Sequence, residues 1–146
     1  MTEQMTQAEQ NKAVVRRLFE EVFNQQHTAV LDQILAPDFR TTFPATPAGR
    51  EGFKQALAVF FRAFPDNHNH VEDMIAEGDR VAVRGHLTAT HQGEFMGIPP
   101  TGKQVQVQYI DIWVAENGKI TGNWVQMDFL GMLQQLGVVP TPRQAS

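Results

Sequence analysis

The sequence predicts an α+β domain in which N-terminal helices pack on one face of an antiparallel sheet. Apolar residues recur at helical spacing as far as Pro65, and consecutive strand-like segments follow from His68 onward. This order, helices first and strands after, differs from the alternation of a parallel fold. The length of 146 residues fits one domain, taken as residues 1–146 with frayed ends at about 1–5 and 138–146.

Composition excludes several classes of protein. The chain has no cysteine, which excludes disulfides, thiolate metal sites and cysteine nucleophiles. A formal net charge of −4 without a basic cluster argues against a nucleic-acid partner. No apolar run approaches the ~20 residues that span a membrane, and the N-terminus lacks the basic start and apolar stretch of a secretory signal. We therefore expect a cytoplasmic protein with neither nucleic acid nor membrane as a partner.

The first helix is predicted from Thr6 to about Asn24. Thr6 and Glu9 stand at the spacing of a capping box, in which each satisfies a free backbone donor of the other. Two apolar series repeat every four residues along this segment, namely Val14, Leu18 and Val22, and Val15, Phe19 and Phe23. Together they predict one broad apolar stripe that faces the core.

Two further helices are predicted before the strands. The first is short, from Thr28 to Leu35, and a brief extended piece follows at Phe39–Phe43. The second runs from about Arg50 to Phe64, and Pro65 ends it. Five large apolar residues share one face of it: Phe53, Leu57, Phe60, Phe61 and Phe64. Such a face can pack against a core or form the wall of an apolar ligand pocket.

Strands and turns fill most of the remaining chain. The predicted strands are His68–Ala76, Arg80–His91, Val105–Glu116 and Lys119–Asp128. Asn117-Gly118 is a strong hairpin signal. The loop Gln92–Lys103 has the length of functional lids and binding loops, and Phe129–Leu136 is predicted to form a short terminal helix.

Four stretches carry a family pattern: residues 72–81 (EDMIAEGDRV), residues 90–103 (THQGEFMGIPPTGK), Asp111-Ile112 before residues 117–120 (NGKI), and residues 130–137 (LGMLQQLG). With them the chain resembles the SnoaL-like polyketide cyclases of the NTF2-like superfamily, over about Asn11–Gly137. The resemblance implies an NTF2-like cone, a curved sheet packed on helices around a deep apolar cavity. It also implies a homodimer joined through the sheet. The activity it implies is ring closure by intramolecular aldol condensation, with a cavity aspartate as acid/base and no metal or organic cofactor.

The last strand departs from the usual pattern of that family. Family members commonly have His-Trp-Asp-x-x-Asp there, and the first aspartate is catalytic. This chain has NWVQMD at residues 123–128. Val125 therefore stands at the position of the catalytic aspartate, Asn123 stands at that of the histidine, and Asp128 matches the second aspartate.

The register of the last hairpin decides which side chains meet. A two-residue Asn-Gly turn would pair Asp111 with Trp124, whereas a three-residue loop with Gly118 left-handed would pair Asp111 with Asn123 and Tyr109 with Val125. The resemblance favours the second, which we adopt. One face then carries Tyr109, Asp111, Trp113, Asn123, Val125 and Met127. This mixture of aromatic, apolar and a few polar groups suits a small-molecule cavity.

The opposite face of the same hairpin carries Ile110, Ile112, Val114 and Trp124. Helices cover only one face of the predicted sheet, so these apolar residues need a second cover. A twofold sheet-to-sheet homodimer is the natural candidate.

Asp111 is the candidate general acid/base. Apolar walls raise the pKa of a carboxyl group toward neutrality, and Tyr109 or Asn123 could donate a hydrogen bond to an enolate oxygen. An open alternative is a structural aspartate that accepts hydrogen bonds from Asn123 or a nearby hydroxyl. The candidate substrate-binding residues are Phe19, Phe23, Thr41, Phe60, Trp113, Val125 and Met127.

The histidines are not interpreted as metal ligands. His68, His70 and Glu72 alternate on one strand at a spacing that could hold a metal, but no closed ligand set accompanies them. We interpret them as an exposed strand edge and predict no metal site. His91 precedes the loop Gln92–Lys103 and is expected to orient it.

Two main functional hypotheses follow. The first is an enzyme, a cofactor-free cyclase, lyase or isomerase acting on an apolar, carbonyl-containing small molecule. The alternative is a non-catalytic small-molecule-binding protein, which Val125 favours. A ketosteroid-isomerase-like or epoxide-hydrolase-like activity rests on analogy of fold alone.

Overall fold

The computed structural model describes residues 5–141, and its elements follow the predicted order. The helical segments are α1 Gln7–Arg17, η1 Leu18–Asn24, η2 Thr28–Val30, α2 Leu31–Ile34, α3 Gly49–Ala63 and α4 Phe129–Gln135. The strands are β1 Leu35–Thr41, β2 His68–Glu77, β3 Arg80–Thr90, β4 Gln104–Glu116 and β5 Lys119–Met127. The predicted frayed ends lie largely outside the described residues. Within residues 5–141, no helix has the length and apolar character needed to cross a membrane.

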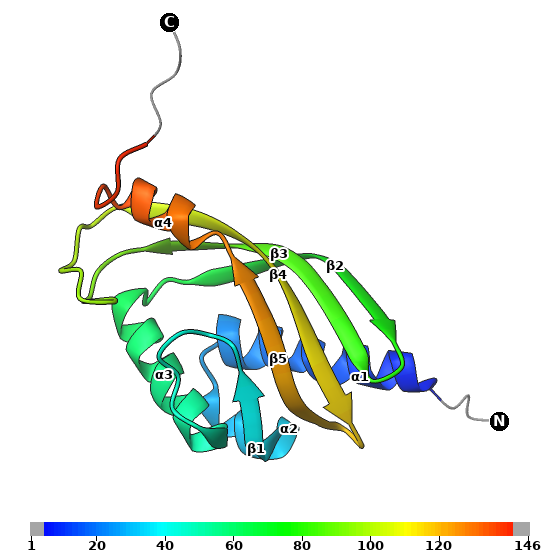
Figure 1. The fold of residues 1–146 in the computed structure, drawn as a ribbon. Helices are drawn as coiled ribbons and strands as arrows, with labels where there is room; N and C mark the ends of the chain where they lie inside the picture. Colours follow the sequence, from blue (N-terminus) through cyan, green and yellow to red (C-terminus); the bar gives the residue numbers. More distant parts are fainter. Residues whose placement is uncertain (1–4, 142–146) are drawn as a thin grey trace, which may run out of the picture.

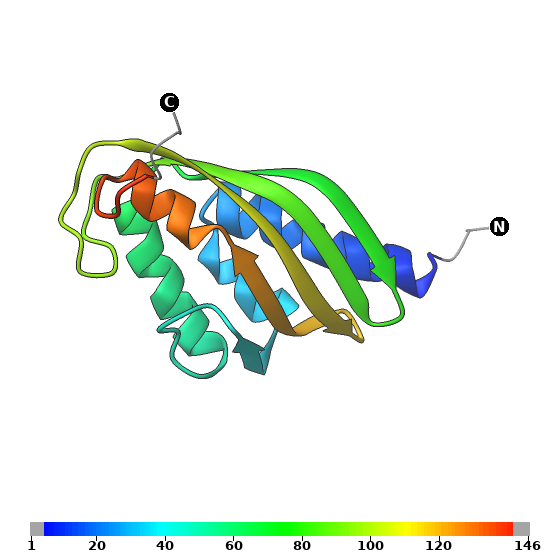
Figure 2. The ribbon, with the colours of Figure 1, turned by 45° about the horizontal axis from the view of Figure 1, so that its top comes forward.

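The strands form one curved five-stranded sheet in the order β1-β5-β4-β3-β2. Strands β2 to β5 pair antiparallel as predicted, which confirms the α+β class. The expectation of a wholly antiparallel sheet is corrected at one edge, where β1 pairs parallel with β5. Helices α1 and α3 lie on one side of the sheet, which curves over them (Figures 1 and 2). The concave side of the sheet therefore faces the helices.

The segment predicted as the first helix consists of two kinds of helix. At its start, the backbone N–H of Glu9 donates to the hydroxyl of Thr6 at 3.1 Å, as expected for a cap. After Arg17 the chain continues as the seven-residue π-helix η1, which carries Phe19 and Phe23. π-Helices are rare and often lie at functional sites. Both phenylalanines are therefore placed by an unusual local geometry.

The core fills the space between the sheet and the helices. Along β3 and β4 every second residue is buried, so one face of each strand points to the helices. Trp113, 1% exposed, lies at the centre of an aromatic cluster with ring centroids 5.8 Å from Phe19 and 6.4 Å from Phe39. This packing fixes the inner side of the hairpin against η1 and β1.

The β4–β5 hairpin has a register that neither predicted pairing describes. Glu116 pairs with Lys119 across a two-residue turn, in which Asn117 and Gly118 both have positive φ. One extra residue, Thr121, then shifts the register, so that Asp111 pairs with Val125 and Tyr109 pairs with Met127. The bulge shifts the pairing of β5 by one residue relative to a plain two-residue turn. The side chains predicted to share the inner face therefore do share it, although the predicted pairs were wrong.

Candidate functional site

A cavity of about 90 Å³ lies between the inner face of the sheet, η1 and α3. It brings together every residue predicted as catalytic or substrate-binding: Phe19, Phe23, Thr41, Phe60, Tyr109, Asp111, Trp113, Asn123, Val125 and Met127. The wall also contains Phe53, Leu57 and Phe61 of the helix face that the sequence offered as a possible pocket wall, and residues that the sequence reasoning missed: Phe43, Ala56, Asn67, Asn69 and Leu87. The placement is a finding, and the catalytic and binding roles of these residues stay predictions.

The cavity wall continues beyond the end of β1, beside β5. Thr41 is the last residue of β1 to pair with β5. Beyond that pair, the backbone N–H of Val125 on β5 donates to the hydroxyl of Thr42 at 2.9 Å. The chain then leaves the sheet, and Phe43 joins the cavity wall. Phe43, Phe60 and Val125 are only half-buried.

Of the described residues that line this cavity, Asp111 alone is a carboxylic acid. Its side chain is on the inner face of β4 and the residue is 7% exposed. Burial raises the pKa of Asp111 to about 7, and the backbone N–H of Gln126 opposes that rise. A carboxyl group with this pKa exchanges a proton readily near neutral pH, which is what a general acid or base requires.

Tyr109 is positioned beside Asp111 by a glycine. Its ring stacks on Phe19 with centroids 6.2 Å apart, and its cross-strand partner is Gly85. A Cβ atom at Gly85 would lie 3.0 Å from the Tyr109 hydroxyl and 2.4 Å from the carbonyl oxygen of His70. Burial, and then the charge of Asp111, raises the pKa of Tyr109, so the hydroxyl keeps its proton and can donate.

Unpaired polar atoms concentrate at the cavity. Among the described residues, eight buried side-chain nitrogen and oxygen atoms have no hydrogen-bond partner in the protein. Five belong to the cavity wall: Asn67 Oδ1, the Tyr109 hydroxyl, Asp111 Oδ1, Trp113 Nε1 and Asn123 Oδ1. Such atoms are normally paired in folded proteins. Their concentration in one apolar cavity marks it as the candidate site.

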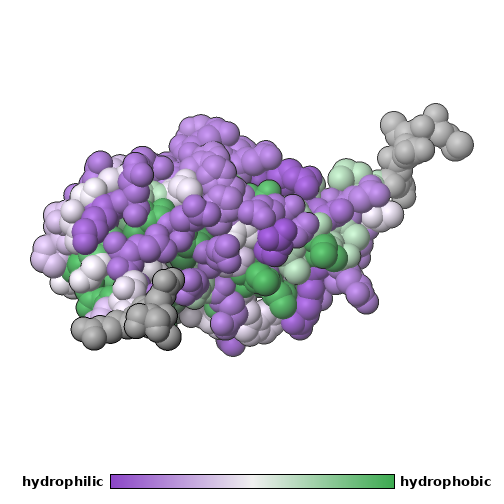
Figure 3. Space-filling model, turned by 90° about the horizontal axis from the view of Figure 1, so that it is seen from above, coloured by the Kyte–Doolittle hydropathy of each residue, from purple (hydrophilic) through white to green (hydrophobic). Residues whose placement is uncertain are grey.

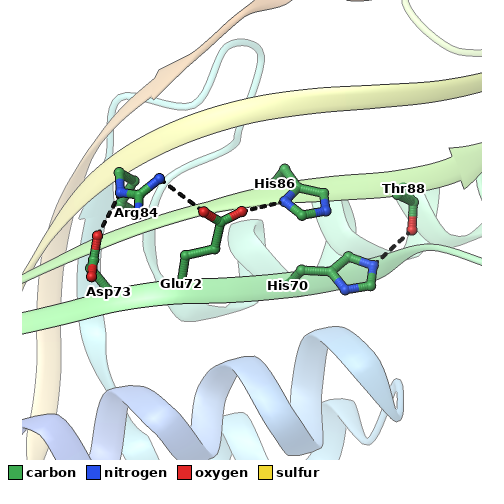
Figure 4. A network of polar contacts seen from close by, with 6 residues as sticks. All are labelled: His70, Glu72, Asp73, Arg84, His86 and Thr88. Atoms are coloured by element: carbon green, nitrogen blue, oxygen red, sulfur yellow. Dashed lines mark hydrogen bonds and ion pairs between the residues drawn. The ribbon is translucent and has the colours of Figure 1, made fainter.

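The outer face of the sheet carries the polar network shown in Figure 4, on β2 and β3. Its contacts are His70 Nε2 with the Thr88 hydroxyl at 3.1 Å, His86 Nδ1 with Glu72 at 2.7 Å, Arg84 with Glu72 at 2.9 Å, and Arg84 with Asp73 at 2.6 Å. His68 and His70 are exposed on the edge strand, in agreement with their interpretation from the sequence. In the part of the chain that the structure describes, no group of three or more histidine or acidic side chains is arranged to hold a metal.

His91 lies at the base of the loop Gln92–Lys103. Its imidazole is fully buried, and Nδ1 accepts a hydrogen bond from the backbone N–H of Thr101 at 3.2 Å. Its backbone N–H and C=O pair with Lys103 and Gly102 across the loop. These contacts favour the expected role in orienting the loop.

Comparisons with known proteins agree on one family. A family model described as SnoaL-like polyketide cyclase matches residues 13–136. The nogalonic acid methyl ester cyclase of Streptomyces nogalater is 29% identical over 122 residues, which is 79% of this chain and 89% of that protein. A protein classed as a SnoaL-like polyketide cyclase from Jannaschia sp. CCS1 has a similar structure, with a TM-score of 0.85 at 28% identity over 96% of this chain and 100% of its own. TsrD from Streptomyces laurentii gives 0.83 at 28% identity over 93% of this chain and 100% of its own. The family match includes every residue of the cavity wall.

Proposed function

Because the chain belongs to the SnoaL-like polyketide cyclase family, we propose that it performs cofactor-free acid/base chemistry on a mainly apolar, carbonyl-containing small molecule held in the cavity. The observation that carries the proposal is Asp111, a buried carboxyl group with a pKa of about 7 among apolar walls. The reaction class is cyclisation, with lyase and isomerase reactions as related uses of the same proton transfer.

The proposed reaction begins at a carbon next to a carbonyl group. The Asp111 carboxylate takes a proton from that carbon, and the electron pair moves onto the carbonyl oxygen to give an enolate. Tyr109 or Asn123 donates a hydrogen bond to this oxygen, and the unpaired Trp113 Nε1 is a further donor in the same wall. The enolate carbon then bonds to a second carbonyl carbon of the same molecule. The oxygen of that second carbonyl recovers the proton from Asp111, so atoms and charge balance in the aldol addition.

Asp111 can replace the aspartate that family members commonly carry at position 125. Asp111 and Val125 are direct partners on β4 and β5, and both line the cavity. Side chains directly opposite each other have Cβ atoms about 4.5–5.5 Å apart. A carboxyl group on β4 therefore serves the same part of the cavity from the neighbouring strand.

The second candidate function is ligand binding without turnover. Val125 cannot transfer a proton, and Asn123 occupies the position of the family's histidine. These two departures favour a protein that kept the cavity and lost the reaction. Under this alternative Asp111 is one of the groups that bind the ligand.

Turnover of nogalonic acid methyl ester, the compound in the name of the Streptomyces nogalater cyclase, tests the first candidate. We expect wild-type protein to cyclise it and Asp111→Asn, which keeps the shape of the side chain, to lower kcat by about 10²–10⁴-fold while binding persists. Equal turnover by the variant would contradict the assignment of Asp111. Binding by the wild type without turnover, with a ligand identified by native mass spectrometry of the purified protein, would favour the second candidate.

We propose that the protein forms a homodimer through the outer face of the sheet. Ile75, Ala82, Ile112 and Trp124 form one cross-strand row from β2 to β5. Ile75 and Trp124 are 68% and 46% exposed. The molecule seen from above is largely hydrophilic, with apolar areas between the polar ones (Figure 3). We expect wild-type protein to sediment as a dimer at micromolar concentration and Ile112→Glu to sediment as a monomer, whereas a wild-type monomer would contradict the proposal.

A further inference from the structure

Polar groups of the cavity wall lie toward two ends of the inner sheet face. At one end Trp113 pairs with Asn123. At the other end, Asn69 pairs with Leu87, which in turn pairs with Val107. Asn67 lies two residues before Asn69 in the chain. Val107 and Trp113 are six residues apart on β4, which at ~3.3 Å per residue is about 20 Å. The cavity wall thus has a second polar end, which the acid/base proposal does not use.

Asn67 has a fixed orientation and one unused atom. Its Nδ2 donates to the carbonyl oxygen of Phe64 at 3.0 Å, and its backbone N–H donates to the same oxygen at 3.1 Å. The amide is thereby oriented, and Oδ1 remains a pure acceptor. This oxygen is buried, has no partner in the protein, and belongs to a residue only 5% exposed. An unpaired buried acceptor destabilises the free protein, so the turn after α3 does not explain it.

Asn24 shows what a structural asparagine looks like in this molecule. Its Nδ2 donates to the carbonyl oxygen of Asn69 at 3.1 Å, and its Oδ1 accepts from the backbone N–H of Asn69 at 2.7 Å. Both amide atoms are used, and together they tie η1 to β2. Asn67 uses only one of its two amide atoms, which marks it as different.

The wall also restricts what can pair with Asn67. Among residues 5–141, the cavity lining contains no lysine, arginine or histidine, and it contains the carboxyl group of Asp111. An anionic ligand would therefore have no countercharge there. The partner of the Asn67 oxygen must be a donor, and the mainly apolar wall favours a neutral O–H or N–H group over a cation, whose charge would lose its solvation there. Aromatic rings, among them Phe23, Phe60 and Phe61, line the same cavity and suit a flat apolar ligand body.

We propose that Asn67 forms a second polar subsite, whose Oδ1 accepts a hydrogen bond from a neutral hydroxyl or N–H group of the ligand. The ligand class is an uncharged, flat ring system with a hydrogen-bond donor toward the Asn67 end and its reacting carbonyl group at Asp111. The subsite rests on the proposed function, because it assumes that this cavity holds the ligand.

Two probes that differ in one donor test the subsite: 2-naphthol and 2-methoxynaphthalene. Tryptophan fluorescence, with Trp113 in the wall, gives their dissociation constants. We expect the wild type to prefer 2-naphthol by up to about tenfold. Asn67→Leu should remove the preference and keep affinity for the ether. Asn123→Leu, at the other end, should retain the preference. Equal preference in the wild type and Asn67→Leu, or loss of preference only in Asn123→Leu, would overturn the proposal.

Unfolding of the ligand-free variants separates a subsite from a structural cap. We expect Asn67→Leu to match or exceed the wild type in urea midpoint, because the backbone N–H of residue 67 still satisfies Phe64. Asn24→Leu should lower the midpoint. A fall in Asn67→Leu as large as that in Asn24→Leu would show a structural residue and contradict the subsite. Absence of turnover with the donor preference intact would contradict the acid/base proposal alone.

Discussion

The two faces of the same sheet treat polar side chains in opposite ways. On the outer face, His70, Glu72, Asp73, Arg84, His86 and Thr88 pair with one another (Figure 4). On the inner face, Tyr109, Asp111, Trp113 and Asn123 each leave a buried polar atom unpaired. The outer side chains have partners within the protein, whereas the inner ones have atoms that the proposed function assigns to a ligand. The comparison separates polar groups that are paired within the protein from polar groups that the proposed ligand would pair.

The pKa values of two acids show the same contrast. On the exposed face, the hydrogen bond from His86 lowers the pKa of Glu72, and Arg84 adds to that effect. In the cavity, burial raises the pKa of Asp111 to about 7. Glu72 is therefore a permanent charge near neutral pH, while Asp111 can hold or release a proton.

The largest expected effect is on stability in Asp111→Asn. The ordinary pKa of 3.8 governs the unfolded state and about 7 governs the folded state, so the folded protein binds the extra proton between these values. Stability from this group is full below pH 3.8 and falls as pH rises to 7. The uncharged variant should therefore be more stable than wild type at pH 8 by on the order of 4 kcal/mol, with no such gain near pH 4. Urea unfolding at both pH values measures this, and a structural, ion-paired Asp111 would instead make the variant less stable at pH 8.

A second carboxyl group opposite the first should have the next largest effect. Val125→Asp places it directly across from Asp111, and we expect a loss of about 3 kcal/mol at pH 8 because the new charge is desolvated beside a like charge. Val125→Asn, with the same shape and no charge, is the matched control in chemical denaturation. If the two variants unfold alike, the cavity is wet enough to screen a carboxylate.

Added side-chain volume is expected to have different costs on the two faces of β3. Gly85→Ala puts a Cβ atom 2.4 Å from the His70 carbonyl oxygen on the inner side, so the backbone must shift. We expect a loss of about 2 kcal/mol in chemical denaturation. Ala82→Val adds apolar volume to the outer side of the same strand and should change stability little. Equal costs for the two substitutions would remove this difference between the faces.

The smallest effect is expected for the outer network. Glu72→Gln removes the charge that pairs with Arg84 and His86, but all three side chains contact solvent and exposed pairs contribute little. Its urea midpoint should stay close to that of the wild type. A loss comparable to that of Gly85→Ala would show that the outer network stabilises the fold as strongly as the inner packing does.

Periodic signals predicted most of the fold and much of the site. The phenylalanine face of α3 and the alternation along β4 depend only on local spacing, so they placed Phe60, Trp113 and Asp111 correctly around one cavity. The hairpin pairs were wrong because the bulge at Thr121 lies where β5 also pairs with β1, a contact distant in sequence. The π-helix has no periodic signature of its own. Cytoplasmic location, dimer formation and substrate remain predictions.

Asn67 shows what kind of site residue the sequence did not reveal. It stands alone in the turn between α3 and β2, outside any repeating pattern. Asn69, by contrast, alternates with the exposed His68 and His70, and strand parity could have placed it on the inner face. Only the three-dimensional pairing of the Asn67 amide shows that one of its atoms is unused.

The pKa of Asp111, measured directly, tests the central claim. Carbon-13 NMR of aspartate side-chain carboxyl groups, with Asp111→Asn to assign the signal, follows this group through a titration. We expect a midpoint near the value of about 7 that burial produces, which keeps Asp111 able to gain and lose a proton in the cavity. A midpoint at the ordinary 3.8 or below would show a solvated or paired carboxylate and would contradict the acid/base role.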